Sequence, residues 1–182
     1  MKGIVEGIAR GREKKHEVIG FPILFTARWL HVITQDNFDA YIPRTFSGRT
    51  WLVNTVDGQP TLGVFVMDNK PMYWLKQVKY VESIYLDKEP TEQIPPPNME
   101  PKQFSKGKLT FTGVPLSLLA PLVGKQLWWV QSSDGLERVI TEHQLENWIL
   151  TEQRELINLN TKAGSWIKNV LRFCGEKGYI SL

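Results

Sequence analysis

Cysteine is nearly absent from this sequence, since Cys174 is the only one among 182 residues. A single thiol cannot form an internal disulfide, so the sequence is not that of a disulfide-stabilised secreted domain. The three histidines, His16, His31 and His143, are far apart in the sequence and complete no zinc-binding pattern with Cys174. We therefore expect no bound metal and no requirement for an oxidising compartment.

Long hydrophobic runs are absent as well. The longest apolar stretch covers residues 18–33, but Gly20, Pro22, Arg28 and His31 interrupt it, and it is too short to cross a bilayer. The first residues lack the apolar core of a signal peptide. The sequence predicts a soluble cytoplasmic protein with no membrane partner.

Glycine-rich phosphate-binding loops are also missing. Neither G-x-x-x-x-G-K nor G-x-G-x-x-G occurs, so no nucleotide and no other cofactor is predicted. Cys174 lies among apolar residues without a neighbouring histidine, which is typical of a buried and unreactive thiol. These absences favour a protein that is not an enzyme.

One arrangement of charged residues offers an enzymatic alternative. Asp57, followed after a predicted strand by Asp68 and Lys70, has the order acid, strand, acid, lysine found in metal-dependent nucleases of the PD-(D/E)xK type. In such a site carboxylates hold a divalent cation and lysine stabilises the attacking water or the phosphate. At about 3.3 Å per residue, however, the strand would hold the two acids roughly 20 Å apart. The aspartates are therefore more typical of tight turns than of a shared metal site.

Tryptophan, by contrast, is abundant, and positive charge is concentrated towards the two ends of the sequence. The seven tryptophans are spread over the whole chain, and most are expected in the core. The formal charge is +3 for residues 1–50, −3 for 51–100 and +3 for 101–182. Basic flanks around an acidic middle are compatible with an anionic partner and also with an ordinary solvated surface.

The clearest secondary-structure signals are two hairpins. Trp51–Val56 and Thr61–Met67 are apolar and β-branched, and the intervening Asp57-Gly58 supplies a turn. Residues 126–131 and 136–140 bracket a second Asp-Gly turn in the same way. For residues 72–86 the aromatic and β-branched content favours strand, although helical spacing fits as well.

Helices are predicted mainly near the C-terminus. Thr141 and Gln144 fit a capping box, and the helix that it opens would bury Leu145, Trp148, Ile149 and Leu156. A last helix would bury Trp166, Ile167, Val170, Leu171 and Cys174 and end at Gly175. A shorter helix is expected over residues 115–123, and a short edge strand over residues 179–182.

These elements predict an α+β fold. A mainly antiparallel twisted sheet, open or barrel-like, would come from the N-terminal half, and a C-terminal hairpin and two helices would pack on it. Residues 1–182 are expected to form a single domain, with a proline-rich surface connection at about 88–108. No internal repeat is visible.

The functional hypothesis is a non-catalytic binding or accessory protein, with nucleic acid or a nucleic-acid-handling protein as the preferred partner. Basic side chains would contact phosphate, and the exposed member of the Trp128/Trp129 pair would stack on a base. The predicted surface consists of Arg10, Arg12, Lys14, Lys15, Arg44, Arg49, Lys106, Lys108, Lys125, Trp128 and Trp129. The alternatives are an inhibitor or adaptor that contacts only protein and, second, the metal-dependent nuclease with Asp57, Asp68 and Lys70.

Overall fold

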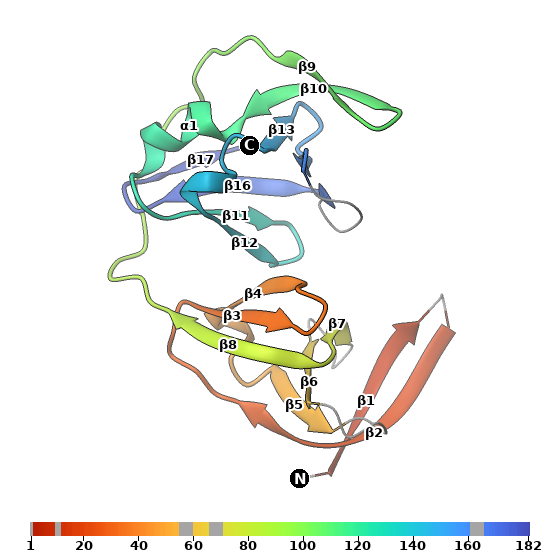
Figure 1. Cartoon of the computed structure of the whole chain (residues 1–182). Helices are drawn as coiled ribbons and strands as arrows, with labels where there is room; N and C mark the ends of the chain where they lie inside the picture. The colour runs from red at the N-terminus through yellow and green to blue at the C-terminus, as the bar shows by residue number, and fades with distance from the viewer. Residues whose placement is uncertain (1, 10–11, 55–59, 66–70, 161–165) are drawn as a thin grey trace. The chain divides into compact units, whose positions relative to one another are not determined.

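The computed structural model describes residues 2–9, 12–54, 60–65, 71–160 and 166–182 (Figure 1). The chain divides into two compact units, unit 1 with residues 1–86 and unit 2 with residues 87–182. The boundary directly precedes the predicted proline-rich connection, in which residues 88–101 belong to no helix and no named strand. The expectation of a single domain stays a prediction.

Most of the chain is β-structure, and the predicted α+β class is wrong. Strands make up 50% of the chain and helical residues 10%, and the strands form four antiparallel sheets. Within the described residues the only α-helix is α1, Leu116–Val123. Consequently no pair of C-terminal helices packs on an N-terminal sheet.

Unit 1 contains a five-stranded and a three-stranded antiparallel sheet. The strand orders are β1-β2-β5-β6-β7 and β4-β3-β8. The elements are β1 Lys2–Ala9, β2 Arg12–Ile23, β3 Trp29–Thr34, β4 Asp39–Pro43, the 3-10 helix η1 Arg44–Phe46, β5 Thr50–Asn54, β6 Pro60–Phe65, β7 Pro71–Leu75 and β8 Val78–Ile84. Strands β1 and β7 at the two edges of the larger sheet contact each other, so this sheet is strongly curved.

Unit 2 contains a five-stranded and a four-stranded antiparallel sheet. The strand orders are β15-β14-β13-β10-β9 and β12-β11-β16-β17. The elements are β9 Lys102–Lys106, β10 Leu109–Pro115, α1, β11 Trp128–Ser132, β12 Glu137–Ile140, the 3-10 helix η2 Glu142–Gln144, β13 Trp148–Thr151, β14 Leu156–Asn158, β15 Trp166–Ile167, β16 Val170–Gly175 and β17 Tyr179–Ser181.

The two units share one topology. Strands β1, β2, β5, β6 and β7 pair in the same order as β9, β10, β13, β14 and β15, and β3 lies between β4 and β8 as β11 lies between β12 and β16. A 3-10 helix follows β4 in unit 1 and β12 in unit 2. The chain is therefore an internal structural repeat, which was not visible in the sequence.

Matched hairpin turns support this equivalence in atomic detail. Unit 1 uses Thr34, Asp36 and Phe38, and unit 2 uses Ser132, Asp134 and Leu136. In each turn the hydroxyl donates to the aspartate carboxylate, which also accepts the amide of the residue two positions later. The residue after each aspartate, Asn37 or Gly135, has a positive φ of 62° or 86°.

Two glycines occupy matched positions in the larger sheets. Gly20 of β2 lies so close to Leu52 of β5 that a Cβ atom would overlap the Leu52 carbonyl oxygen. A Cβ atom on Gly113 of β10 would likewise overlap the carbonyl oxygen of Leu150 in β13. Glycine at both places permits a backbone approach that no side chain would allow.

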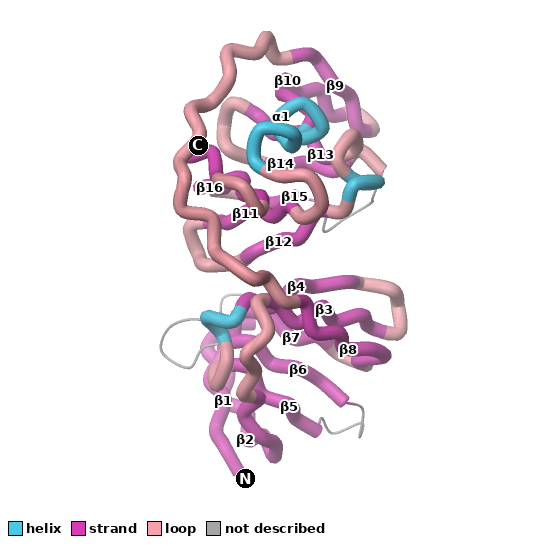
Figure 2. Tube along the Cα trace, turned by 90° about the vertical axis from the view of Figure 1, so that its left-hand side faces the viewer, coloured by secondary structure: helices cyan, strands magenta, loops and turns pink. Residues whose placement is uncertain are grey.

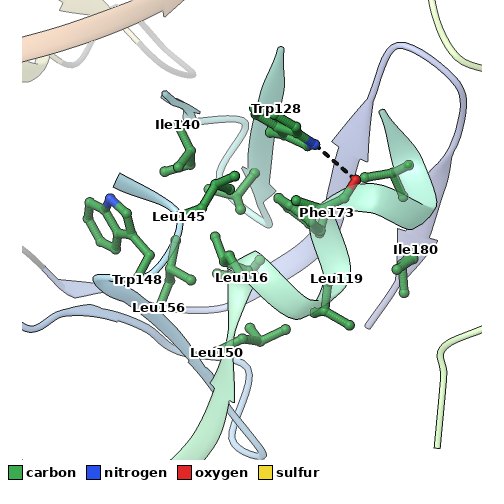
Figure 3. Close-up of a cluster of buried hydrophobic side chains, with 14 residues drawn as sticks. Leu116, Leu119, Trp128, Ile140, Leu145, Trp148, Leu150, Leu156, Phe173 and Ile180 are labelled. Atoms are coloured by element: carbon green, nitrogen blue, oxygen red, sulfur yellow. Dashed lines mark hydrogen bonds between the residues drawn. The ribbon is translucent and has the colours of Figure 1, made fainter. Parts of the chain in front are cut away.

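The core of unit 2 is built around α1 (Figure 3). Leu116 and Leu119 project from this helix towards Phe173 and Ile180, and all four side chains are buried. The indole N–H of Trp128 donates to the Ala120 carbonyl at 3.0 Å, which ties β11 to the helix. The helix, cyan in Figure 2, contacts β10, β13 and β16.

Unit 1 has a separate core that contains no α-helix residue among its described members. These members are Ala27, Leu30, Val32, Ile42, Phe46, Leu62 and Leu75. The side chains come from the β2–β3 connection, from the β3–β4 hairpin, from η1 and from the facing strands β6 and β7. They hold the two sheets of unit 1 together by burial of apolar surface.

The two predicted C-terminal helices are strands. Trp148 and Ile149 lie in β13 and Leu156 in β14, where a helix was predicted, and all four residues of β13 are buried. A strand buried on both faces shows no apolar and polar alternation, so its residues can also match a helical spacing. The capping box is present, since Thr141 N–H donates to Gln144 Oε1 at 3.2 Å, but it opens η2. The segment from Trp166 to Gly175 forms β15 and β16.

Both hairpin predictions are confirmed in their strands. β5 pairs with β6, and β11 pairs with β12. Residues 72–86 contain β7 and β8, which confirms strand over helix there. The predicted short helix and the C-terminal edge strand are confirmed as α1 and β17.

Candidate functional site

The predicted basic residues of unit 1 divide between the two ends of β2. Arg12, Lys14 and Lys15 lie in the first half of β2, Arg44 and Arg49 lie in the segment between β4 and β5, and Arg10 lies outside the described residues. The Gly48 amide donates to Ile23, the last residue of β2, at 2.8 Å, which locates that segment at the far end of the strand. Lys15 and Ile23 are about 26 Å apart along an extended strand. The structure does not bring the two groups together.

The predicted lysines of unit 2 are also separate. Lys106 and Lys108 lie at the turn between β9 and β10, whereas Lys125 follows α1, and Figure 1 shows these segments on opposite sides of the unit. Lys106 Nζ donates to the Asn158 carbonyl at 2.6 Å, so this side chain supports the sheet. Lys108 and Lys125 are exposed.

Neither tryptophan of the 128/129 pair is a stacking platform. Trp128 belongs to the core around α1, and Trp129 is completely buried. The expectation that one ring is exposed is wrong. Strand β11 lies in the interior of its sheet, between β12 and β16, and side chains on both of its faces are buried.

The nuclease alternative cannot be placed, because Asp57, Asp68 and Lys70 all lie outside the described residues. Among the residues that the structure describes, no group of three or more histidine, cysteine, aspartate or glutamate side chains is arranged to hold a metal ion. No helix in the described part of the chain is both long and apolar enough to span a membrane.

Unit 1 has an open cavity on its surface, called here the unit 1 hollow. It has a volume of about 450 Å³ and is lined by Leu24, Phe25, Thr26, Ala27, Ser47, Ser83 and Tyr85. Leu24 is 80% exposed and Tyr85 67% exposed. Two large apolar side chains therefore lie at the border of this depression, and most of the surface of each is exposed to solvent.

Backbone and side-chain hydrogen bonds fix the walls of the unit 1 hollow. The Phe25 amide donates to Ser47 Oγ at 2.9 Å, which joins the β2–β3 connection to the segment after η1. Arg44 Nη1, from η1 itself, donates to the Thr26 carbonyl at 3.3 Å. The hollow is thus a built part of unit 1.

The repeat identifies what occupies the matching place in unit 2. Strands β2 and β3 are joined by five residues, Leu24 to Arg28, whereas β10 and β11 are joined by twelve, Leu116 to Leu127, which include α1. Matching the hairpins makes Ser47 equivalent to Leu145, and matching β8 with β16 makes Ser83 equivalent to Gly175.

Both equivalents in unit 2 adjoin α1. The Leu145 carbonyl accepts the Ser117 amide at 3.2 Å, and a Cβ on Gly175 would overlap the Val123 carbonyl. The unit 1 hollow therefore lies where unit 2 has its helix.

Exposed basic residues accompany the unit 1 hollow. Arg44 and Arg49 flank Ser47 on the segment that forms one wall, and both are exposed. Glu82 lies next to Ser83 on β8, but strand alternation turns it to the other face, where its carboxylate is 3.7 Å from His31 Nδ1. The segment of residues 44–49, which contributes Ser47 to the hollow, thus carries two exposed arginines.

Comparison with models of known protein families, with curated proteins and with solved structures gives no match. The site must therefore be judged from its own geometry. Sequence reasoning did not find Leu24 and Tyr85, because an apolar residue beside a strand gives the same signal whether it is buried or exposed. The informative signal would have been the unequal length of the two matched connections, which requires the repeat to be known.

Proposed function

We propose that this chain is a non-catalytic binding protein that contacts a protein partner through the unit 1 hollow. The observation that supports this proposal is the exposure of Leu24 and Tyr85 beside a cavity of about 450 Å³. Cavities of this size are typical of binding sites, and exposed apolar groups at a concave surface mark contacts with other molecules. A cytoplasmic location is part of the proposal.

Protein is preferred over nucleic acid because of where the basic residues and the tryptophans lie. Direct binding of nucleic acid needs several cations along one path and aromatic faces open to bases. The basic residues are split within each unit, and the Trp128 and Trp129 rings are buried. A nucleic-acid-handling protein remains within the proposed class of partner.

Site-specific photocrosslinking tests this proposal. A photoreactive phenylalanine analogue replaces Leu24 in one full-length protein and Leu171 in another, and each protein is irradiated in cells of its native host. Leu171 is the control because it is also an exposed leucine, in unit 2, with 42% of its surface open to solvent. We expect a discrete adduct from position 24 that protease removes and nuclease leaves intact, and none from position 171.

Three outcomes contradict the proposal. Equal adducts from both positions, or none from position 24, would mean that the unit 1 hollow is not a binding site. A position 24 adduct that nuclease removes would identify nucleic acid as the partner and overturn the choice of protein.

A further inference from the structure

The internal repeat provides a guide to the chemistry of the partner, because one copy of the site is filled from within the chain. In unit 2 the space that corresponds to the unit 1 hollow is occupied by α1. The buried side chains of α1 are Leu116, Leu119, Ala120 and Val123, at intervals of three, one and three residues. This is the apolar stripe of an amphipathic helix, and Figure 3 shows Leu116 and Leu119 directed into the core.

The same position in unit 1 has a shorter connection that cannot supply such a helix. Leu24 to Arg28 form no helix, and Leu24 projects into solvent with 80% of its surface exposed. Ser47 and Ser83 stand where unit 2 has Leu145 and Gly175. Unit 1 therefore keeps the frame of the helix site, but its short connection contributes Phe25 and Ala27 to the lining of the hollow and no helix.

The charges near the unit 1 hollow indicate which side chains a bound partner would carry. Arg44 and Arg49 are exposed on one wall of the unit 1 hollow, whereas Glu82 of β8 is directed to His31 on the opposite face of its sheet. Arg44 is held beside the hollow by its bond to the Thr26 carbonyl, so a helix seated in the hollow would lie near this positive charge. Acidic side chains there would be attracted, and basic ones repelled.

We infer that the unit 1 hollow binds a short amphipathic helix of a protein partner, apolar on one face and acidic beside it, in the place that α1 takes in unit 2. This inference deepens the proposed function and rests on it. The contacts would follow the helix-in-groove mode, with apolar anchors at intervals of three and four residues.

The test uses the full-length protein and two stapled helical peptides of about 14 residues, since unstapled helices of that length are only marginally stable in water. Both peptides carry leucines at intervals of three and four residues. One has glutamates and the other lysines along the edges of the apolar face. Fluorescence anisotropy of the labelled peptides measures the dissociation constants.

The wild-type protein is expected to bind the glutamate peptide at least about tenfold more tightly than the lysine peptide. Leu24→Asp should weaken binding of the glutamate peptide about tenfold or more through loss of an apolar contact. Arg44→Glu with Arg49→Glu should reverse the preference between the two peptides. Leu118→Asp on the exposed side of α1 is the matched control and should change neither value.

A second variant distinguishes a true loss of binding from misfolding of the Leu24→Asp protein. Ser83→Trp fills the unit 1 hollow from an exposed position and should abolish binding without lowering the midpoint of thermal unfolding. Binding that survives both Leu24→Asp and Ser83→Trp, or no binding of either peptide, overturns the inference. Self-association of wild type that Leu24→Asp removes would instead make a second copy of the chain the occupant, which also overturns it.

The two proposals can fail separately. A position 24 adduct with protein, together with no peptide binding, would leave the proposed function standing and reject the helix as the occupant. Absence of both would reject the proposed function and the inference together.

Discussion

Units 1 and 2 have one topology, and they differ most clearly in a single connection. Five residues join β2 to β3 in unit 1, and twelve residues with a helix join β10 to β11 in unit 2. The longer connection fills its unit with Leu116 and Val123, whereas the shorter one leaves a cavity bordered by Leu24 and Tyr85. The strands are paired alike in both units. Whether this site is filled or open therefore depends on the connection between the second and third strands of the unit.

The largest expected effect comes from shortening one leucine in each connection. Leu116→Ala should lower the free energy of unfolding of unit 2 by about 2 to 5 kcal/mol, because the side chain is fully buried among α1 and its strands. Leu24→Ala should change that of unit 1 by less than about 0.5 kcal/mol. Urea denaturation, followed by hydrogen exchange to resolve the units, measures both. Equal losses would show that Leu24 is as much a core residue as Leu116, which would break the comparison.

A smaller effect is expected where the two units agree. Gly20→Ala and Gly113→Ala should each destabilise their own unit by about 1 to 3 kcal/mol, because the new Cβ would overlap the backbone of Leu52 or Leu150. Ser105→Ala, at an exposed position of β9, serves as the control. Thermal unfolding of the three variants gives the values. If only one of the two substitutions destabilises its unit, the two units are not equivalent at this pair of neighbouring strands.

The smallest effect concerns the matched hairpin turn of unit 1. The Thr34 hydroxyl, followed by the Phe38 amide, lowers the pKa of the exposed Asp36 carboxyl below its ordinary value. The stabilisation from this carboxylate is present above the unfolded pKa and is lost as the pH falls through the lower folded pKa. Thr34→Val should raise the pKa of Asp36 in an NMR titration, and Thr45→Val at an exposed site should leave it unchanged. An unchanged pKa of Asp36 in Thr34→Val would show that the Thr34 hydroxyl does not lower it.

The sequence predicted several local elements of this fold correctly but did not predict its overall topology. The Asp-Gly turns predicted two hairpins, and the proline- and glycine-bounded segment predicted α1, because turn and boundary residues act over a few positions. The two C-terminal helices were wrong because the residues of β13 are all buried and show no alternation. The spacing of apolar residues alone could not distinguish a buried strand from a helix.

The repeat and the candidate site needed long-range information. Equivalent positions at the candidate site hold different residues, such as Ser47 and Leu145 or Ser83 and Gly175. The matched glycines and aspartates are isolated residues, which do not by themselves reveal a repeat. The shared strand pairing becomes visible only in the three-dimensional arrangement. The basic residues were assigned to one surface from composition, and composition does not determine which end of β2 each one occupies.

The pairing of β3 with β8, and of β11 with β16, has a kinetic consequence. Most neighbouring strands in each unit form local hairpins, but these two pairings join an early strand to one made much later by the ribosome. Such closures are slow because a long loop must be ordered first. Until β8 is synthesised, β3 presents an unpaired edge that another nascent chain can add to. A chain truncated at Leu75 should therefore aggregate during refolding, as light scattering would report, and the completed unit should not.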